Sequence, residues 1–202
     1  LGARSVGIPA KESITHDALA RLRADAGKRG YAPLDNLGDI PTTPTYANRI
    51  LAMEQDIGNP NSPISSLRYP AVSELATELL PTSFTGPDVN SLIKQLRETG
   101  NKGANIPYGG DQSAQKLGKA QLSGSRALEG LVDEHLLQFG ASNVIPNLQA
   151  ARQEIAQSHT LEKALNTATG DVNAHVFGQR VKNGKPITGD QKLIGDFAAA
   201  FP

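Results

Sequence analysis

The longest helical pattern in the chain is DQSAQKLGKAQLSGSRALEGLVDEHLLQFG, residues 111–140. Its second half places apolar and aromatic residues three and four positions apart, the spacing that brings side chains to one face of an α-helix. Asp111 is of a type that caps free N–H groups at a helix start. The pattern therefore predicts a helix from Asp111 to about Gly140, and the residues of its predicted apolar face are Leu128, Leu131, Val132, His135 and Phe139.

Three glycines interrupt this predicted helix, namely Gly118, Gly124 and Gly130. Each glycine in a helix interior costs about 1 kcal/mol relative to alanine. A glycine also lets another backbone approach closely, because it has no Cβ. The glycines therefore indicate either a close helix crossing or a break in the helix.

Four helix starts precede this stretch, and each combines a capping residue or a proline with a following apolar pattern. The predicted helices run from Thr15 to about Gly27, from Pro44 to before Gly58, from Pro70 to about Leu80, and from Thr85 to about Gly103. The run GNPNSP, residues 58–63, is rich in turn formers and predicts a loop.

Three more helices are predicted after Gly140. The first covers about Val144 to Leu165, and Leu148 and Ile155 lie on its apolar face. The last two cover about Val172 to Lys182 and Thr188 to Ala200.

Almost no stretch alternates polar and apolar residues with a period of two, so strands are not expected. The predicted fold class is mainly α, as a helical bundle or hairpin array with long Pro/Gly-rich loops. We expect three regions: an extended N-terminal arm over residues 1–13, a short-helix region over residues 14–84, and a main helical domain over residues 85–202. Because the chain starts at Leu1 rather than Met, we also expect it to be part of a longer or processed polypeptide.

The charge balance favours a protein partner over a nucleic acid. Twenty basic and twenty acidic residues give a formal net charge of zero, whereas a DNA-binding protein needs a basic surface that displaces counterions. A local basic patch is possible on one predicted helix, but a solvated helix face is the favoured interpretation; its residues are Arg21, Arg23, Lys28 and Arg29. No apolar run is long enough to cross a bilayer, so no stable membrane insertion is expected.

The residues that usually carry chemistry form no recognised motif. The chain has no cysteine, and its four histidines do not pair at a ligand spacing. His135 follows two acids and could in principle bind a metal, but a hydrogen-bonded histidine on a helix face is favoured. No nucleophile elbow or phosphate-binding loop is present. We therefore expect no catalytic residues, no cofactor and no metal.

One enzymatic alternative remains open. A pair of carboxylates could cleave a glycosidic bond, which would suit a cell-wall-degrading enzyme. The candidate carboxylates are Glu154, Glu162, Asp171 and Asp190.

The apolar content indicates a lean core that neighbouring subunits help to complete. Leu, Ile, Val and Phe together make up roughly a quarter of the chain, close to the level at which folding fails. The apolar faces of the long predicted helices are thus candidate interfaces, with Leu128, Leu131, Val132, Phe139, Leu148 and Ile155 as the candidate residues.

The second half of the chain also resembles a known family. The resemblance is carried by ARQEIA at 151–156, TLEKALN at 160–166, TGDV at 169–172, GKPITGDQK at 184–192 and FAAAFP at 197–202. ALE at 127–129 and DEHL at 133–136 are similar as well. In these residues the chain resembles a family of uncharacterised virion-associated proteins of tailed bacteriophages and prophages.

The resemblance implies a protein of the virion with no known catalytic residues. Its expected partners are other phage virion proteins, in a symmetric assembly of several copies in the tail or head–tail region. An internal protein that is ejected with the genome is the first alternative, and the cell-wall-degrading enzyme is the second.

Overall fold

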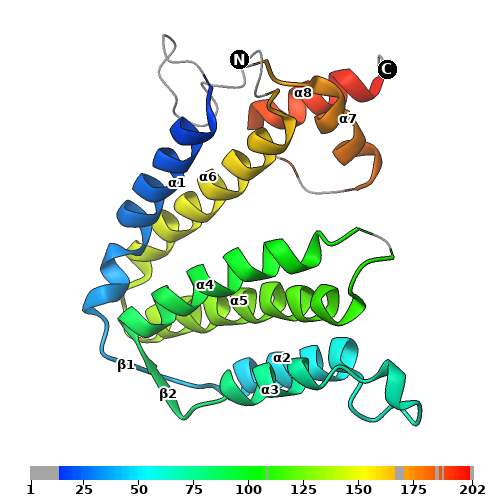
Figure 1. The fold of residues 1–202 in the computed structure, drawn as a ribbon. Helices are drawn as coiled ribbons and strands as arrows, with labels where there is room; N and C mark the ends of the chain where they lie inside the picture. Colours follow the sequence, from blue (N-terminus) through cyan, green and yellow to red (C-terminus); the bar gives the residue numbers. More distant parts are fainter. Residues whose placement is uncertain (1–13, 108, 167–170, 185–186, 188, 201–202) are drawn as a thin grey trace. The chain divides into compact units, whose positions relative to one another are not determined.

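The computed structural model describes residues 14–107, 109–166, 171–184, 187 and 189–200. In these residues the chain forms eight α-helices, short 3₁₀ and π turns, and one two-stranded sheet (Figure 1). The prediction of a mainly α fold is confirmed. The α-helices are α1 (His16–Tyr31), α2 (Pro44–Met53), α3 (Pro70–Glu78), α4 (Gly86–Ala104), α5 (Gln112–Gln138), α6 (Ile145–Ala164), α7 (Ala174–Lys182) and α8 (Gly189–Ala200).

The chain divides into two compact units. Unit 1 contains residues 1–32 and 146–202, and unit 2 contains residues 33–145. The boundary expected between residues 84 and 85 falls inside unit 2, because β2 (Ser83–Thr85) pairs with β1 (Asp39–Pro41) and leads directly into α4. The expected N-terminal arm, residues 1–13, lies outside the described residues.

Side-chain caps set the helix starts that the sequence predicted. The hydroxyl of Thr15 accepts a hydrogen bond from the N–H of Ala18 at the start of α1. Thr43 caps α2 and Thr85 caps α4 in the same way, and the carboxylate of Asp111 caps α5. Each cap satisfies an N–H group that the first helical turn leaves free, so the local sequence fixes where these helices begin.

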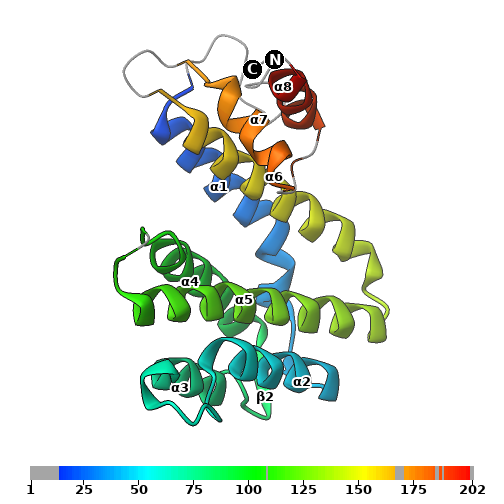
Figure 2. The same ribbon diagram turned by 90° about the vertical axis from the view of Figure 1, so that its right-hand side faces the viewer.

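In unit 2, α4 and α5 form an antiparallel hairpin whose backbones touch at glycines (Figures 1 and 2). A Cβ added at Gly118 would lie 2.3 Å from the backbone nitrogen of Ala104, and one at Gly103 would lie 2.8 Å from the carbonyl oxygen of Ala114. Since α5 is one continuous helix from Gln112 to Gln138, Gly118 marks a close helix crossing and not a break.

The other helices of unit 2, α2 and α3, pack against α5 (Figure 2). Tyr46 of α2 is fully buried, and its hydroxyl donates to the carbonyl oxygen of Leu79 at 2.7 Å. Its ring meets Phe84 of β2 edge to face at 6.0 Å. Phe84 pairs across the sheet with Ile40, although the sequence pattern predicted no strands. This short ribbon closes one end of the core.

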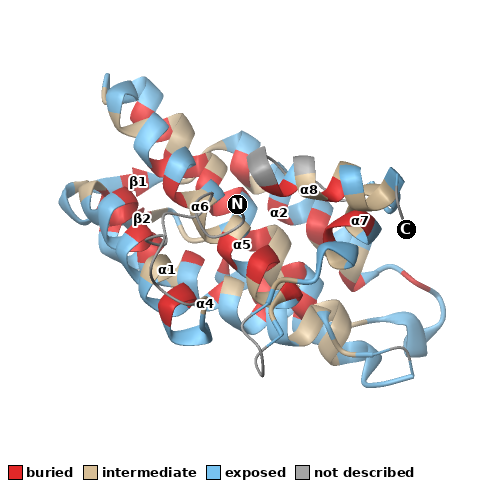
Figure 3. Cartoon of the chain, turned by 90° about the horizontal axis from the view of Figure 1, so that it is seen from above, coloured by how far each residue is buried: buried red, intermediate tan, exposed pale blue. Residues whose placement is uncertain are grey.

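In unit 1, α1 runs antiparallel to α6, and α7 packs against α8. Its core is small and centres on Leu19 of α1, Leu161 and Ala164 of α6, and Phe177 of α7. Burial of one such large apolar side chain contributes about 1.5–3 kcal/mol. Figure 3 shows buried and exposed residues alternating along the helices, as expected for helices with one packed face.

Candidate interaction surface and the Glu162 cluster

Four of the six predicted interface residues lie in the core. Leu128, Leu131, Val132 and Leu148 have no exposed surface, so the chain itself covers them and leaves nothing for a partner to contact. An apolar helix face packs equally well inside a chain or between chains, and helical spacing does not distinguish the two. The two remaining residues are Ile155, which is half-buried, and Phe139.

Phe139 is the predicted interface residue that the structure exposes, with 70% of its surface accessible. It is the C-cap residue of α5, and Leu137, two positions earlier, is 61% exposed. Gly140 follows with a positive φ of 72°, and the N–H of Ala141 donates to the carbonyl of Leu136. This is a Schellman cap, which fixes the helix end. The aromatic ring is thus held at the surface by a defined backbone conformation.

A second exposed apolar pair lies on the loop between the π turn Glu54–Gly58 and α3. Ile64 and Leu67 are each about half exposed. The N–H of Tyr69 donates to the carbonyl of Gly58 at 2.9 Å and closes the base of this loop. The ammonium group of Lys116 lies 5.4 Å from the centre of the Tyr69 ring. These contacts hold the loop against α5 and leave its two aliphatic side chains in solvent.

The acid and histidine that suggested a metal site serve other contacts. Glu134 accepts a hydrogen bond from the hydroxyl of Thr43 at 3.0 Å and pairs with Arg49 at 3.3 Å, which ties α5 to α2. His135 stacks on the ring of Phe139 at 4.5 Å, and burial lowers its pKa. Among the residues that the structure describes, no group of three or more acids and histidines is placed to hold a metal ion.

The carboxylates considered for glycoside cleavage were Glu154, Glu162, Asp171 and Asp190. The structure uses two of them to join α6 to α1, since Glu154 pairs with Arg29 and Glu162 pairs with Arg23, each at 3.0 Å. The side chain of Asp190 lies outside the described residues. The same two ion pairs involve half of the predicted basic patch, so that patch is partly neutralised by α6.

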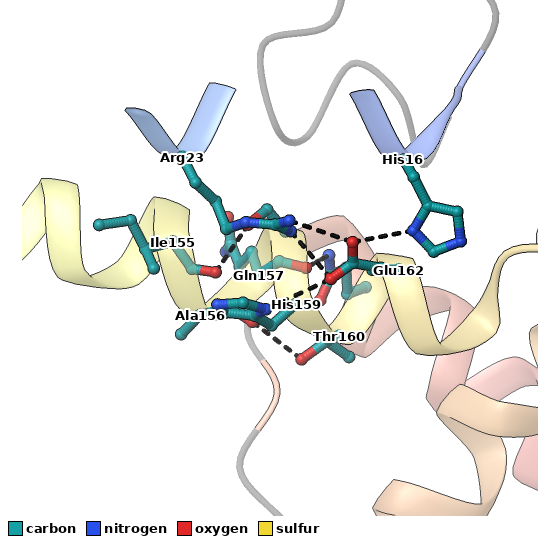
Figure 4. A network of polar contacts seen from close by, with 10 residues as sticks. His16, Arg23, Ile155, Ala156, Gln157, His159, Thr160 and Glu162 are labelled. Atoms are coloured by element: carbon teal, nitrogen blue, oxygen red, sulfur yellow. Dashed lines mark hydrogen bonds and ion pairs between the residues drawn. The ribbon is translucent and has the colours of Figure 1, made fainter. Parts of the chain in front are cut away.

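Among the described residues of unit 1, a group of polar side chains surrounds Glu162, and we call its four residues the Glu162 cluster: His16, Arg23, His159 and Glu162 (Figure 4). Arg23 donates to both oxygens of Glu162, each at 3.0 Å. Nδ1 of His16 lies 2.9 Å from Oε1 of Glu162, and Nδ1 of His159 lies 3.4 Å from Oε2. A two-pronged Arg–carboxylate pair is strong and fixes the relative position of the two helices.

The surroundings of Glu162 act on its pKa in opposite directions. Partial burial raises the pKa, because it disfavours the charged form. Hydrogen bonds from His16 and Arg23, together with the charge of Arg23, lower it by more, so the pKa lies below its ordinary value of 4.5. Glu162 is therefore an anion throughout the neutral range.

This cluster was not predicted from the sequence. Two signals were available: His16 and Arg23 are seven residues apart, or about two helical turns, and His159 precedes Glu162 by three residues. Each signal places two residues on one helix face. The pairing of α1 with α6, which brings the two faces together, was not visible in either segment.

In the described part of the chain, no helix has both the length and the apolar character that a membrane span requires. No protein-family model, curated protein or solved structure matches the chain.

Proposed function

We propose that the chain is a non-enzymatic structural component of a tailed-bacteriophage virion that docks on other virion proteins in the tail or head–tail region. The proposal starts from the resemblance of residues 127–202 to virion-associated proteins. It adds that several copies assemble with the symmetry of the particle.

The exposed Phe139 is the observation that carries the docking role. An aromatic side chain that is 70% exposed and held by a helix cap loses little conformational entropy when a partner covers it. Aromatic residues of this kind dominate the binding energy of many protein interfaces. Leu137, in the same last turn of α5, is a second exposed apolar residue at this helix end.

The test is the protein composition of purified particles of the phage or prophage that encodes the chain. We expect quantitative mass spectrometry to find the chain in a copy number that the particle symmetry allows, both before and after genome release. Particles that lack the chain would contradict the proposal. Loss of the chain on genome release would favour the ejected protein, and clearing of peptidoglycan in a zymogram would favour the hydrolase.

A substitution at Phe139 tests the surface itself. Loss of an interface aromatic costs about 2 kcal/mol or more, or roughly thirtyfold in affinity. We therefore expect Phe139→Ser to lower the amount of chain in particles strongly, while thermal unfolding of the free chain stays within a few degrees of wild type. Gln138→Ser, at the neighbouring exposed polar position, is the matched control and should leave incorporation unchanged. Equal incorporation of both variants would exclude Phe139 from the interface.

A further inference from the structure

The Glu162 cluster gathers several positively charged or protonatable groups around one carboxylate. Arg23 occupies both oxygens of Glu162, and the two histidines share those same oxygens (Figure 4). His16 and Arg23 come from α1, whereas His159 and Glu162 come from α6. The cluster therefore lies across the contact between the first and second segments of unit 1.

The charges around His159 are unbalanced once it is protonated. On the α1 side, His159 lies near Arg23, and His16 contacts the other oxygen of Glu162, Oε1. On α6 itself, the charged neighbours of His159 are Glu162 and Lys163. The described contact from α8 at this place is uncharged, since Gln191 donates to the backbone carbonyl of Gln157. Among the described residues, Glu162 is thus the acid that would offset a proton on His159, and Arg23 already holds it.

The location of His159 makes this proton unfavourable in the folded chain. About half of its side chain is covered, and Oε2 of Glu162, which lies 3.4 Å from its Nδ1, also receives Arg23 at 3.0 Å. Burial of the ring and the positive charge of Arg23 outweigh the attraction of Glu162, so the pKa of His159 lies below its ordinary value of 6.5.

We propose that the Glu162 cluster is an acid-sensitive clasp, in which a proton taken up by His159 beside Arg23 loosens α1 from α6. In the neutral state, Arg23 and Glu162 form a balanced pair that closes the clasp. In the acid state, the added positive charge competes with Arg23 for the same carboxylate, and α1 opens more often from its partner helix.

The direction of the effect follows from linkage. A histidine with a lowered pKa in the folded state stabilises the fold above the pKa of the unfolded chain, near 6.5. This stabilisation is lost as the pH falls through the folded value. Glu162 acts in a separate window below 4.5, because its own pKa is lowered from that value. The clasp should therefore weaken between pH 7.5 and pH 5.5, while Glu162 is still ionised.

Hydrogen exchange of the α1 amides, corrected for the intrinsic effect of pH on exchange, measures this opening directly in the full chain. We expect a modest effect, because solvent screens the charge of the half-exposed His159 ring. We expect protection of α1 in the wild type to fall about threefold from pH 7.5 to pH 5.5. His159→Gln cannot be protonated and should remove this fall.

His175→Gln is the matched control, because His175 is an exposed histidine of the same unit that contacts Gln179 and not the cluster. This variant should keep the wild-type fall in protection. Circular dichroism at both pH values verifies that each variant is folded. The proposal is overturned if wild-type protection does not change, if the fall persists in His159→Gln, or if it disappears in His16→Gln alone.

Discussion

The two units join their long helices by different means. In unit 2, α4 and α5 are neighbours in the sequence, and Gly103 and Gly118 bring their backbones into contact. In unit 1, α1 and α6 are separated by residues 32–144, and ion pairs of Arg23 and Arg29 with α6 bridge them. Close backbone contact holds the first pair, whereas ion pairs supplement a small apolar core between α1 and α6.

The buried residues of the two long helices show the same difference. In the second half of α5 the buried face carries large aliphatic residues, namely Leu128, Leu131, Val132 and Leu136, whereas four of the six buried residues of α6 are alanine, serine or threonine. A smaller buried apolar area contributes less hydrophobic free energy, so charged pairs supply more of the contact in unit 1. Unit 1 has one close approach of its own, where a Cβ at Gly30 would meet Ala151 at 2.2 Å.

A methyl group at the glycine crossing should have the largest effect. In Gly118→Ala the new Cβ would lie 2.3 Å from the backbone nitrogen of Ala104, and a backbone group cannot move aside as a side-chain tip can. Overpacking of this kind costs about 1–3 kcal/mol, and we expect the upper part of that range. Urea denaturation should report a lower free energy of unfolding with an unchanged slope.

A glycine-to-alanine substitution in α1 should raise the free energy of unfolding instead of lowering it, and it serves as the control. Gly27 has no atom within 4 Å of its missing Cβ. In Gly27→Ala the helix propensity of alanine therefore acts alone and should stabilise the chain by up to about 1 kcal/mol. Equal destabilisation by both substitutions would mean that the backbone contact in unit 2 is not what distinguishes the two pairs.

Local signals in the sequence were sufficient for the helices but not for their partners. Caps at Thr15, Thr43 and Asp111 fixed helix starts, because a cap acts within one turn. The ribbon of β1 and β2 was missed, because each strand has three residues and pairs across residues 42–82. The interface prediction had the same weakness: helical spacing identified Leu131 as part of a packing face, and only the fold could tell that α2 and α4 cover that face.

Loss of the Glu162 charge should have an intermediate effect. Glu162→Gln removes the acceptor that both guanidinium nitrogens of Arg23 use and leaves that group mostly covered, with 19% of its side chain exposed. We expect a loss of about 1–2 kcal/mol, since a partly buried pair lies between exposed and fully buried ones. Asp25→Asn, at an exposed acid of α1, changes the net charge equally and should cost little.

Salt and acid distinguish this loss from a packing defect. The advantage of wild type over Glu162→Gln should shrink as salt screens the pair. It should also disappear below pH 4.5, because the lowered pKa of Glu162 means that its stabilisation is present above that value and lost as the carboxylate is protonated. If the stability advantage of wild type depended on neither salt nor pH, Glu162 would stabilise the contact by its packing and not by its charge. The corresponding loss in Gly118→Ala should persist in high salt.

The smallest effect is expected at the other ion pair of unit 1. Arg29 is 69% exposed where it meets Glu154, so water competes for both groups, and such pairs contribute about 0.2–1 kcal/mol. Arg29 also lies in the last turn of α1, where a positive charge is favourable regardless of Glu154.

Lys28→Gln removes a neighbouring positive charge from the same turn and corrects for that contribution. We expect Arg29→Gln to lower the free energy of unfolding by less than about 0.5 kcal/mol more than Lys28→Gln does. A double-mutant cycle of Arg29→Gln with Glu154→Gln should give a coupling energy of the same size. A coupling as large as that between Arg23 and Glu162 would mean that exposure does not rank the two pairs, and that charge holds α1 to α6 along its whole length instead of mainly at the Glu162 cluster.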